Sequence, residues 1–528
     1  MPSLVHELTL LQERDGWLGE AALRRLAGSL GVPLHRLESV STFYTHFRRT
    51  PPRALHLEVC RDLSCALAGG AGACARLREA AAGRDDVEVC EVSCLGRCDA
   101  APAAALGPRL LSLAAGGDLL AAIEAGGLDL PEPARRDWGE AEVYADPGER
   151  YGALRRALAG DPADLARQLE ESGLRGMGGA GFPTGRKWSL VAREAARPKY
   201  VICNADESEP GTFKDREILR DLPHLVIEGM ALAARCVGAE KGWVFIRHEY
   251  APERRALERA IREAHAAGAL GERVFGSEFR FDVEVFVSPG GYILGEETAL
   301  LECMEDRRGE PRNKPPYPGT AGLWGQPTLM NNVETLAHAT GILHRGVGWW
   351  RGLARPGFAG HKFISVSGDV ARPGVVLVPF GSTLRELLER CGGMRDGRAL
   401  AAVAPGGASS LFLTAAGLDV PIDFETLQKA GSMLGSGAAI FVAEGRDLVE
   451  VGLNVTRFFR NESCGKCVPC RVGSEKAVKI VEQAGRVGPE TRALLEELDR
   501  TLARTSICGL GQVALGPLLS ILARFPEE

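Results

Sequence analysis

The sequence has no excess of basic residues: Lys and Arg number 63 against 69 Asp and Glu, which gives a formal net charge of −6. Proteins that bind nucleic acid usually carry a basic patch or stripe. Because this chain has no such surplus of positive charge, nucleic acid is not an expected partner.

Long apolar runs are also missing. The beginning, MPSLVHELTLLQERDG, has acidic residues early and no apolar core of signal-peptide length, so we expect a cytoplasmic protein rather than an exported one. The longest charge-free stretch near the C-terminal end covers residues 505–523, but three glycines, a glutamine and a proline interrupt it. A buried connection with a short helix is expected there, without direct membrane insertion.

Cysteine, by contrast, is abundant, with 14 residues. Cytosolic thiols stay reduced, so metal ligation or thiol chemistry is favoured over disulfides. Six cysteines lie between Cys60 and Cys98, and four lie between Cys464 and Cys508. The two groups are candidates for two separate metal sites.

A length of 528 residues suggests roughly three or four domains. We predict a multidomain α/β protein in which residues 1–125 form a helical start followed by a strand–loop–helix–strand domain. Residues 126–150, rich in Gly, Pro and charge, are the predicted linker. Alternating patterns over 151–345 indicate an α/β domain, short β-rich pieces over 346–447 indicate a small α+β domain, and 448–528 is predicted to be helical.

The densest cysteine motif is NESCGKCVPCRVG, in which Cys464, Cys467 and Cys470 are separated by two residues each. Three thiolates from one tight loop can each bind a different iron of a cubane cluster, and the remaining iron needs a remote ligand. Cys508 in TSICGLGQ is available for that role. The spacing favours a [4Fe–4S] cluster, with a zinc ion or inert thiols as the alternatives.

The N-terminal cysteines have another spacing. Cys60 and Cys65 form a C-x₄-C pair, and Cys94 and Cys98 form a C-x₃-C pair, each at the end of a predicted strand. Two such pairs suit a [2Fe–2S] cluster in which each pair binds one iron, although a zinc site or a redox-inactive remnant is the alternative. Cys74 and Cys90 are extra, and we interpret both as packing cysteines.

A glycine-rich stretch, GLRGMGGAGFPTGRKW, spans residues 173–188 and contains the pattern G-x-G-x-x-G. The residues before it look helical rather than like a buried strand, so a Rossmann site is not expected. Glycines still allow a flat ring or a phosphate to approach the backbone, and Lys187 offers positive charge, which favours a nucleotide over a flexible surface loop.

Polar residues follow a predicted strand in YVICNADESEPGTFKDRE (200–217). The carboxylates could bind Mg²⁺ or face solvent, but beside a nucleotide loop we favour another role. Asn204 and Asp206 can hydrogen-bond a flavin's pyrimidine ring, and acidic neighbours electrostatically favour a nicotinamide that becomes NAD⁺. PGGYILGEETALLE (289–302) and NNVETL (331–336) supply further polar groups.

These stretches, together with RGEPRNKPPYP and ESCGKCVPCRVG, resemble the flavin-binding NADH-oxidising subunit of respiratory complex I and its soluble relatives, over about residues 150–528. Residues 1–125 resemble the thioredoxin-like [2Fe–2S] subunit of the same complexes through STFYTHF, the C-x₄-C pair and CLGRC. The resemblance implies a thioredoxin-like [2Fe–2S] domain, a non-Rossmann FMN-binding α/β domain, a ubiquitin-like β-grasp domain and a C-terminal helical bundle with [4Fe–4S].

Carried over by motif, the resemblance places FMN among Gly176, Gly178, Lys187, Asn204, Asp206, Glu207, Tyr292, Gly295, Glu296, Asn331, Asn332 and Thr335, with Gly179 and Ser208 as further cofactor-binding candidates. It places NAD(H) against Phe182, Glu209, Glu297, Lys314 and Tyr317, of which Glu209 and Glu297 are the candidate catalytic residues. The chain departs from the family at Met177, Leu190 and Leu294; Leu190 stands where an aromatic residue often stacks on adenine.

Because both parts are fused in one chain, the chain is similar to the beta subunit of NAD-dependent, molybdenum-containing formate dehydrogenases. That resemblance implies a molybdenum-containing catalytic alpha subunit and a small [2Fe–2S] gamma subunit as partners. The diaphorase subunit of NAD-reducing hydrogenases and the NADH-oxidising subunit of complex I are the alternatives, and a zinc-stabilised scaffold is the alternative from another class. No molybdenum-type or nickel-type site is recognisable in the sequence.

Overall fold

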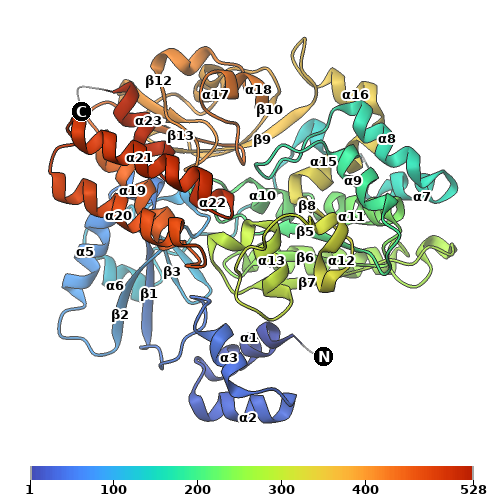
Figure 1. Ribbon diagram of the computed structural model, residues 1–528, viewed down its shortest axis with the longest axis horizontal. Helices are drawn as coiled ribbons and strands as arrows, with labels where there is room; N and C mark the ends of the chain where they lie inside the picture. Colours follow the sequence, from blue (N-terminus) through green and yellow to red (C-terminus); the bar gives the residue numbers. More distant parts are fainter. Residues whose placement is uncertain (1–2, 145, 526–528) are drawn as a thin grey trace.

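The N-terminal region combines three helices with a four-stranded sheet in the computed structural model, which describes residues 3–144 and 146–525 (Figure 1). The helices are α1 (Leu4–Asp15), α2 (Glu20–Leu30) and α3 (Leu34–Ser41), so the predicted helical start is confirmed. Gly31 ends α2 in the left-handed conformation, φ 65°, which glycine adopts without steric cost. The hydroxyl of Tyr44 donates a 2.6 Å hydrogen bond to the carbonyl of Arg307, which ties this lobe to the third quarter of the chain.

The first sheet has the order β2-β1-β3-β4, with β1 parallel to β2 and antiparallel to β3. Its elements are β1 (Leu55–Cys60), α4 (Leu63–Leu67), α5 (Gly70–Ala80), β2 (Val87–Val92), β3 (Ala103–Leu106), β4 (Arg109–Ser112) and α6 (Leu119–Glu124). Leu57, Val59 and Val87 point into one core with α5 and α6, while the alternate residues of β1 and β2 face the other side.

The central region is built on a parallel sheet of order β7-β6-β5-β8, which brings the carboxyl ends of its strands to one edge. Its strands are β5 (Tyr200–Ala205), β6 (Lys241–Arg247), β7 (Asp282–Ser288) and β8 (Thr328–Asn332). Its helices are α7 (Gly152–Ala159), α8 (Pro162–Ser172), α9 (Thr184–Arg193), α10 (Lys214–Asp221), α11 (Pro223–Val237), α12 (Ala251–Ala266), α13 (Glu297–Met304), α14 (Pro318–Ala321), α15 (Val333–Arg345) and α16 (Val347–Gly352).

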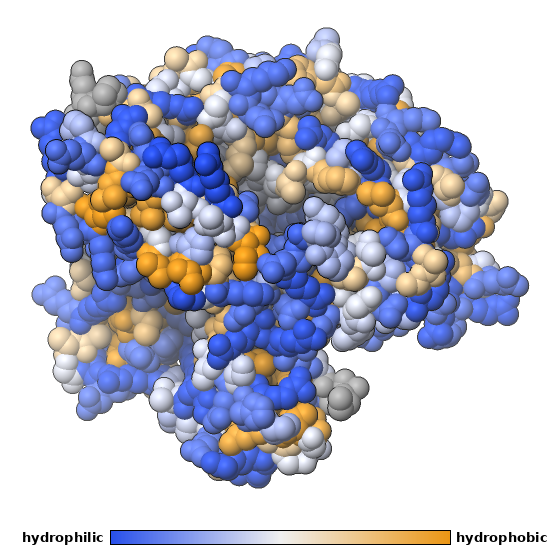
Figure 2. All heavy atoms as spheres, viewed as in Figure 1, coloured by the Kyte–Doolittle hydropathy of each residue, from blue (hydrophilic) through white to orange (hydrophobic). Residues whose placement is uncertain are grey.

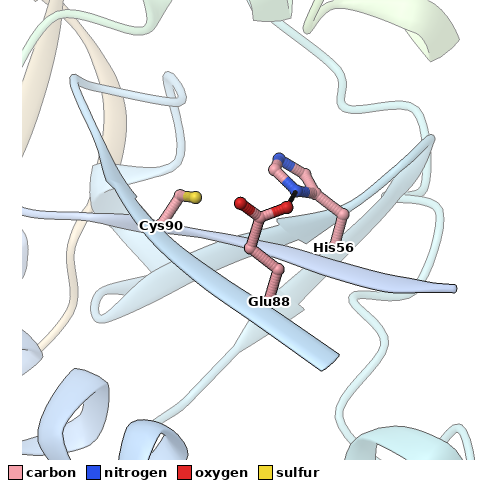
Figure 3. Close-up of side chains that lie close together, drawn as sticks. All are labelled: His56, Glu88 and Cys90. Carbon is pink, nitrogen blue, oxygen red and sulfur yellow. Dashed lines mark hydrogen bonds and ion pairs between the residues drawn. The ribbon is translucent and has the colours of Figure 1, made fainter. Parts of the chain in front are cut away.

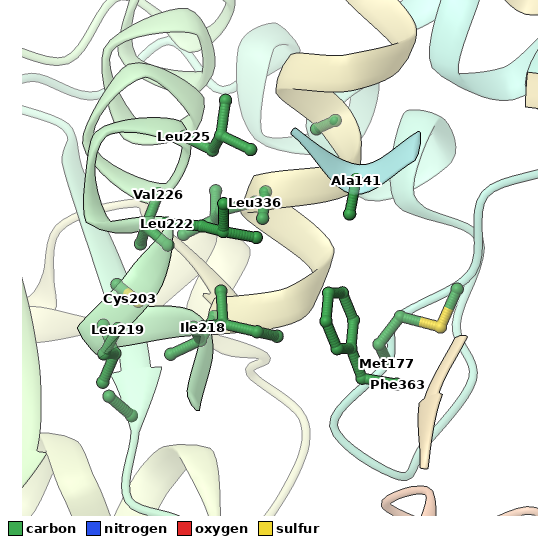
Figure 4. Close-up of a cluster of buried hydrophobic side chains, with 14 of the residues drawn as sticks. Ala141, Met177, Cys203, Ile218, Leu219, Leu222, Leu225, Val226, Leu336 and Phe363 are labelled. Atoms are coloured by element: carbon green, nitrogen blue, oxygen red, sulfur yellow. The ribbon is translucent and has the colours of Figure 1, made fainter. Parts of the chain in front are cut away.

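One apolar core connects this sheet with its neighbours. Figure 4 shows Cys203 of β5 together with side chains of α10, α11 and α15, next to Met177 and Phe363. Ala141 belongs to the same core, so residues 126–150 pack against the central region although they contain no regular strand or α-helix among the residues that the structure describes.

The third region is a five-stranded sheet of order β10-β9-β13-β11-β12. Its elements are β9 (His361–Gly368), β10 (Gly374–Pro379), α17 (Leu384–Arg390), β11 (Leu400–Ala404), β12 (Leu413–Thr414), α18 (Phe424–Lys429) and β13 (Ala438–Ala443). The pattern TLRELLERCGG predicts one helix here, which is α17; α18 is a second helix, which Asp423 caps by accepting the amide of Glu425.

The C-terminal region is helical, as predicted: α19 (Leu448–Asn461), α20 (Val468–Ala484), α21 (Pro489–Thr505), α22 (Gly509–Val513) and α23 (Gly516–Arg524). Residues 505–523 form the expected connection and short helices. Between residues 3 and 525, leaving out residue 145, no helix combines the length and the apolar character needed to cross a bilayer.

Glu228 is a buried carboxyl in α11, 1% exposed, that joins this helix to the preceding segment. It accepts hydrogen bonds from the hydroxyl of Tyr144 and from the amides of Tyr151 and Leu154. Burial raises its pKa to about 7. A carboxyl whose pKa is raised on folding adds stability below its unfolded pKa, about 4.3, and that stability is lost as pH rises toward 7.

The natural chain loses stability as the pH rises from 5 to 8, because Glu228 ionises, whereas an amide cannot ionise. We therefore expect the difference in unfolding free energy between Glu228→Gln and the natural chain to shift by about 1–3 kcal/mol in favour of the variant over this pH range. Urea unfolding at the two pH values measures this difference. Glu258→Gln, at a position of α12 that is 42% exposed and pairs with Arg254, is the control and is expected to show no such trend. A pH-independent effect of Glu228→Gln would contradict the prediction.

Candidate functional site

The carboxyl edge of the parallel sheet gathers the polar residues predicted to bind a flavin. The side chain of Asn204, from the end of β5, donates a 2.9 Å hydrogen bond to the carbonyl of Gly295. Asp206 follows directly and accepts hydrogen bonds from the hydroxyls of Ser208 and Ser288. Ligands of open parallel sheets bind at this edge, so the fold directs these groups toward a bound molecule.

The glycine loop lies between α8 and α9 and packs on the start of α15. A helix precedes it, so the structure confirms that it is not a Rossmann turn. The amide of Met177 donates a 2.8 Å hydrogen bond to the hydroxyl of Thr335. A Cβ added at Gly178 would lie 2.9 Å from the Cβ of Asn332, so only glycine allows this approach.

This packing brings Gly178 against Asn332 and Met177 against Thr335, whereas Gly176 faces the backbone of Phe182 and Gly179 that of Gly435 and Ser436. Asn331 accepts a 2.9 Å hydrogen bond from the indole of Trp188, and Asn332 donates to Asp215. The two asparagines are thus held by partners in α9 and α10. Figure 2 shows the surface hollowed between the C-terminal helices and the region of α8 and α9.

A group of paired charges lies at the start of α13. Glu296 caps the helix, and its other oxygen lies 2.8 Å from the ammonium of Lys314. Glu297 lies 2.9 Å from Lys314 and 3.5 Å from Lys187. Burial alone would raise the pKa of Glu297, but the two ammonium groups together lower it below its usual value, so Glu297 stays ionised.

Glu207 and Glu209 are turned into the protein rather than toward solvent. Glu207, 5% exposed, accepts the amides of Asp215 and Arg216 and the hydroxyl of Tyr250. Glu209 accepts the amide of Ser409 at 2.9 Å, from the third region. Burial raises the pKa of both carboxyls, and of Asp206 to about 7. Solvent-facing carboxylates, one of the alternatives, therefore do not describe this segment.

Phe182, Tyr317 and Leu190 lie at the surface, 42%, 62% and 49% exposed. Within residues 3–144 and 146–525, no side-chain hydrogen bond or ion pair joins Phe182 or Tyr317 to the polar groups above. Exposed rings at the rim of a site suit a substrate that binds and leaves, so both remain predicted contacts for NAD(H).

Four cysteines meet at the ends of the first sheet. Cys60, Cys65, Cys94 and Cys98 are each at most 4% exposed, and the sulfurs of Cys94 and Cys98 are 3.5 Å apart. The neighbouring thiols of Cys65 and Cys94, together with burial, raise the pKa of the Cys60 thiol. Backbone amides also reach the sulfurs: Gly96 donates to Cys94, Ala103 to Cys65, and Gly211 of the central region to Cys98, each at 3.4 Å. A buried quartet with amide donors fits a [2Fe–2S] cluster.

Residues outside the predicted set fix this quartet against the central region. Arg216, 1% exposed, donates to the carbonyl of Gly96 at 2.6 Å and pairs with Asp99 at 2.8 Å. Arg247 donates to the carbonyl of Cys94 at 2.6 Å, and Asp62 accepts the Cys94 amide at 2.7 Å. A Cβ at Gly96 would meet Tyr250 at 2.6 Å, so glycine is required there. The sequence gives no spacing signal for these contacts between distant segments.

The second quartet lies among the C-terminal helices. Cys467 precedes α20, Cys470 lies in its first turn, and Cys508 precedes α22. A Cβ added at Gly511 of α22 would lie 2.9 Å from the Cβ of Cys470, and all four cysteines pack in one cluster, so Cys508 lies near the triplet. Burial raises the pKa of Cys470 and of Cys508 to about 11. The remote ligand is thus beside the triplet, as a [4Fe–4S] cluster requires.

Tyr292 links the flavin-side residues to both cysteine loops. Its amide donates a 2.8 Å hydrogen bond to Glu462, two residues before Cys464, and its ring lies edge-on to Phe458 at 5.0 Å. Glu462 also accepts a hydrogen bond from Ser93, next to Cys94. The predicted flavin position and the two cysteine quartets therefore share one continuous set of contacts.

Comparison with known families assigns each region. Residues 169–340 match the Nuo51 FMN-binding domain, and residues 450–528 match the NADH-ubiquinone oxidoreductase-F iron-sulfur binding region. Residues 2–124 match the thioredoxin-like [2Fe-2S] ferredoxin, and residues 363–412 match the SLBB domain. The chain thus has an FMN-binding domain, a [2Fe–2S] domain and a [4Fe–4S] region, and NAD(H) is the substrate of the family.

Individual proteins agree with this assignment. The chain is 45% identical to an F-type NADH-quinone oxidoreductase subunit of Rhizobium meliloti over 72% of this chain and 92% of that protein. It is 45% identical to the F-type subunit of Escherichia coli over 72% of this chain and 86% of that protein, and 41% identical to the NADP-reducing hydrogenase subunit HndC of Solidesulfovibrio fructosivorans over 72% and 78%.

A solved structure extends the likeness to the N-terminal part. An air-oxidised NAD⁺-reducing [NiFe]-hydrogenase contains a chain that superposes with a TM-score of 0.87 at 32% identity, covering 99% of this chain and 92% of that one. The chain belongs to the family of FMN-binding, NADH-oxidising subunits that includes the F-type subunits of NADH-quinone oxidoreductase, with a thioredoxin-like [2Fe–2S] domain in the same polypeptide.

Proposed function

We propose that this chain is the diaphorase subunit of a multisubunit oxidoreductase, in which it exchanges electron pairs with NAD(H) and single electrons with its iron–sulfur clusters. When bound, FMN supplies that conversion, because it takes up a hydride and returns electrons one at a time. The observation that carries the proposal is the contact from Tyr292 to Glu462, which joins the polar sheet edge to the cysteine loop of the [4Fe–4S] region.

The chain's own residues bind and align rather than react. Asn204 and Asp206 would hold the flavin ring with an amide and a carboxyl at the sheet edge, and Gly178 lets the glycine loop pack directly on Asn332. Glu297 holds the ammonium groups of Lys187 and Lys314 in place at the rim. Such alignment lowers the barrier by fixing the donor and acceptor atoms before hydride transfer.

The Glu297→Gln variant tests the role of the paired charges at the start of α13. The amide loses the charge that holds both ammonium groups, so we expect NADH oxidation to fall about tenfold to a hundredfold while FMN stays bound. Turnover with an artificial acceptor and the flavin absorbance of the purified protein measure the two effects. Glu302→Gln, further along α13 and paired with Arg312, is the matched control with unchanged turnover. Loss of FMN with normal turnover after reconstitution would contradict the role.

For the partner, we propose a molybdenum-containing formate-oxidising alpha subunit with a small [2Fe–2S] gamma subunit, in the cytoplasm. The presence of an FMN-binding domain and a thioredoxin-like [2Fe–2S] domain in one polypeptide supports this arrangement. The purified chain alone is then expected to oxidise NADH with artificial acceptors but not to act on formate.

A hydrogenase diaphorase is the second candidate, favoured by the likeness to the hydrogenase chain over 99% of this chain. A component of complex I is the third, favoured by the NADH-quinone oxidoreductase relatives. Co-purification separates them: a molybdenum-containing partner supports the formate proposal, whereas a nickel-containing or membrane-bound partner overturns it. Zinc without iron or acid-labile sulfide would support a scaffold instead.

A further inference from the structure

The outer face of the first sheet carries a group of metal-ligating side chains away from both cysteine quartets. In the parallel register of β1 and β2, His56 pairs with Glu88 and Glu58 pairs with Cys90. Alternate residues of a strand point to one side, so these four side chains share the face opposite the apolar core of Leu57 and Val59. Figure 3 shows His56, Glu88 and Cys90 standing together on this face.

Three different donor atoms converge there. One ring nitrogen of His56, one carboxylate oxygen of Glu88 and the sulfur of Cys90 all lie within 4.8 Å of one another, and Nδ1 of His56 is 2.8 Å from Glu88. Tetrahedral zinc with bonds of about 2.0–2.3 Å separates its ligands by roughly 3.3–3.8 Å. Small side-chain rotations therefore suffice to bring the three donors to a common ion.

The second nitrogen of His56 faces another carboxylate. Nε2 lies 3.4 Å from Glu58, and Glu58 is held by Arg48 at 2.9 Å. In metal sites a ligating histidine commonly donates its other N–H to a carboxylate, which fixes the ring and its tautomer. His56 is arranged in this way, with Nδ1 toward the donor set and Nε2 toward Glu58.

Cys90 was predicted to be a packing cysteine, as Cys74 was. Cys74 is buried in the core, 2% exposed, and confirms its prediction. Cys90 is half-buried and lies on the opposite face, because it is one residue out of phase with the core positions Val87 and Val89. Burial and the neighbouring Glu88 raise the pKa of its thiol, so the thiol keeps its proton until a cation displaces it.

We propose that His56, Glu88 and Cys90 form a binding site for a divalent transition-metal ion of the zinc class, with a water molecule in the remaining position and Glu58 positioning His56. Nitrogen, oxygen and thiolate ligands together suit Zn²⁺ better than Mg²⁺ or Ca²⁺, which prefer oxygen alone. A bound ion joins β1 to β2, the strands that lead to Cys60 and Cys94. The site is independent of the proposed function.

The full-length chain with both clusters intact tests the site. After incubation with one equivalent of Zn²⁺ and desalting, we expect about one zinc per chain, with iron and acid-labile sulfide unchanged. Zinc-edge X-ray absorption is expected to show a single sulfur ligand beside nitrogen and oxygen. No retained zinc, zinc that replaces iron, or a shell of several sulfurs would overturn the proposal.

Substitution of the individual side chains tests which of them bind the zinc ion. His56→Ala and Cys90→Ser are expected to weaken zinc binding at least 100-fold, and Glu58→Gln about 10- to 100-fold with the sulfur ligand kept. Cys74→Ala, which removes a thiol of the same domain on the other side of the sheet, is the control with unchanged affinity. Equal zinc binding in Cys90→Ser and the natural chain would overturn the assignment. Glu88→Gln provides an independent test should one variant fail to fold.

Discussion

Replacing Cys508 with alanine is expected to remove the [4Fe–4S] cluster and with it roughly four iron atoms per chain. The triplet Cys464, Cys467 and Cys470 cannot complete a cubane alone, and Cys508 is the cysteine brought beside it at the start of α22. Flavin is expected to remain, because the polar sheet edge and the glycine loop lie in another region. Electron delivery to a one-electron partner is expected to fall at least 100-fold.

Iron and sulfide analysis, with paramagnetic resonance of the reduced protein, measures the first effect. Cys236→Ala, a buried cysteine of α11 far from either quartet in sequence, is the control and keeps its full iron content. A Cys508→Ala protein with undiminished iron and an unchanged reduced-cluster signal would show that another residue is the remote ligand.

Arg216→Ala is expected to lower the free energy of unfolding by about 3–5 kcal/mol, because truncation leaves buried polar partners unpaired. Arg216 is 1% exposed and connects Gly96 and Asp99 of the [2Fe–2S] domain with Glu217 of α10. The loss is expected to affect the [2Fe–2S] centre as well, since Gly96 donates to the sulfur of Cys94.

Urea unfolding and the resonance signal of the [2Fe–2S] centre measure both effects. Arg255→Ala is the matched control: Arg255 and Glu132 form an ion pair 3.2 Å long with side chains 56% and 81% exposed, so its loss costs at most about 0.5 kcal/mol. Equal stability of the two variants would contradict the proposed role of the buried arginine.

Local patterns in the sequence predicted most of the elements. The strand predicted at the start of YVICNADE is β5, and Pro489 lies at the first position of α21, where proline is favoured. The spacing of Leu494, Leu495, Leu498 and Leu502 predicts one shared helix face. In α21, Leu495 and Leu502 are buried, but Leu494 is 40% exposed because one residue turns the helix by about 100°. The helix α18 was missed, since a short helix leaves little periodicity to detect.

The grouping of the cysteines could be predicted because the ligands of one cluster often lie at short, regular spacings in the sequence. The contacts that hold the quartets could not: Gly211 reaches Cys98, and Arg216 reaches Gly96, across more than a hundred residues. The hydrogen bond between Glu209 and Ser409 could not be predicted for the same reason, since Ser409 lies in another region. Cys90 is one residue out of phase with Val87 and Val89 and lies opposite the core, but its position beside His56 depends on the register of β1 against β2, which no single-sequence pattern specified.

Anaerobic titration of the purified chain with NADH tests the central claim, that this polypeptide converts electron pairs into single electrons. We expect a yellow protein whose flavin absorbance bleaches with NADH while a paramagnetic iron–sulfur signal appears. A colourless protein, or a flavin that bleaches without any cluster becoming reduced, would contradict it.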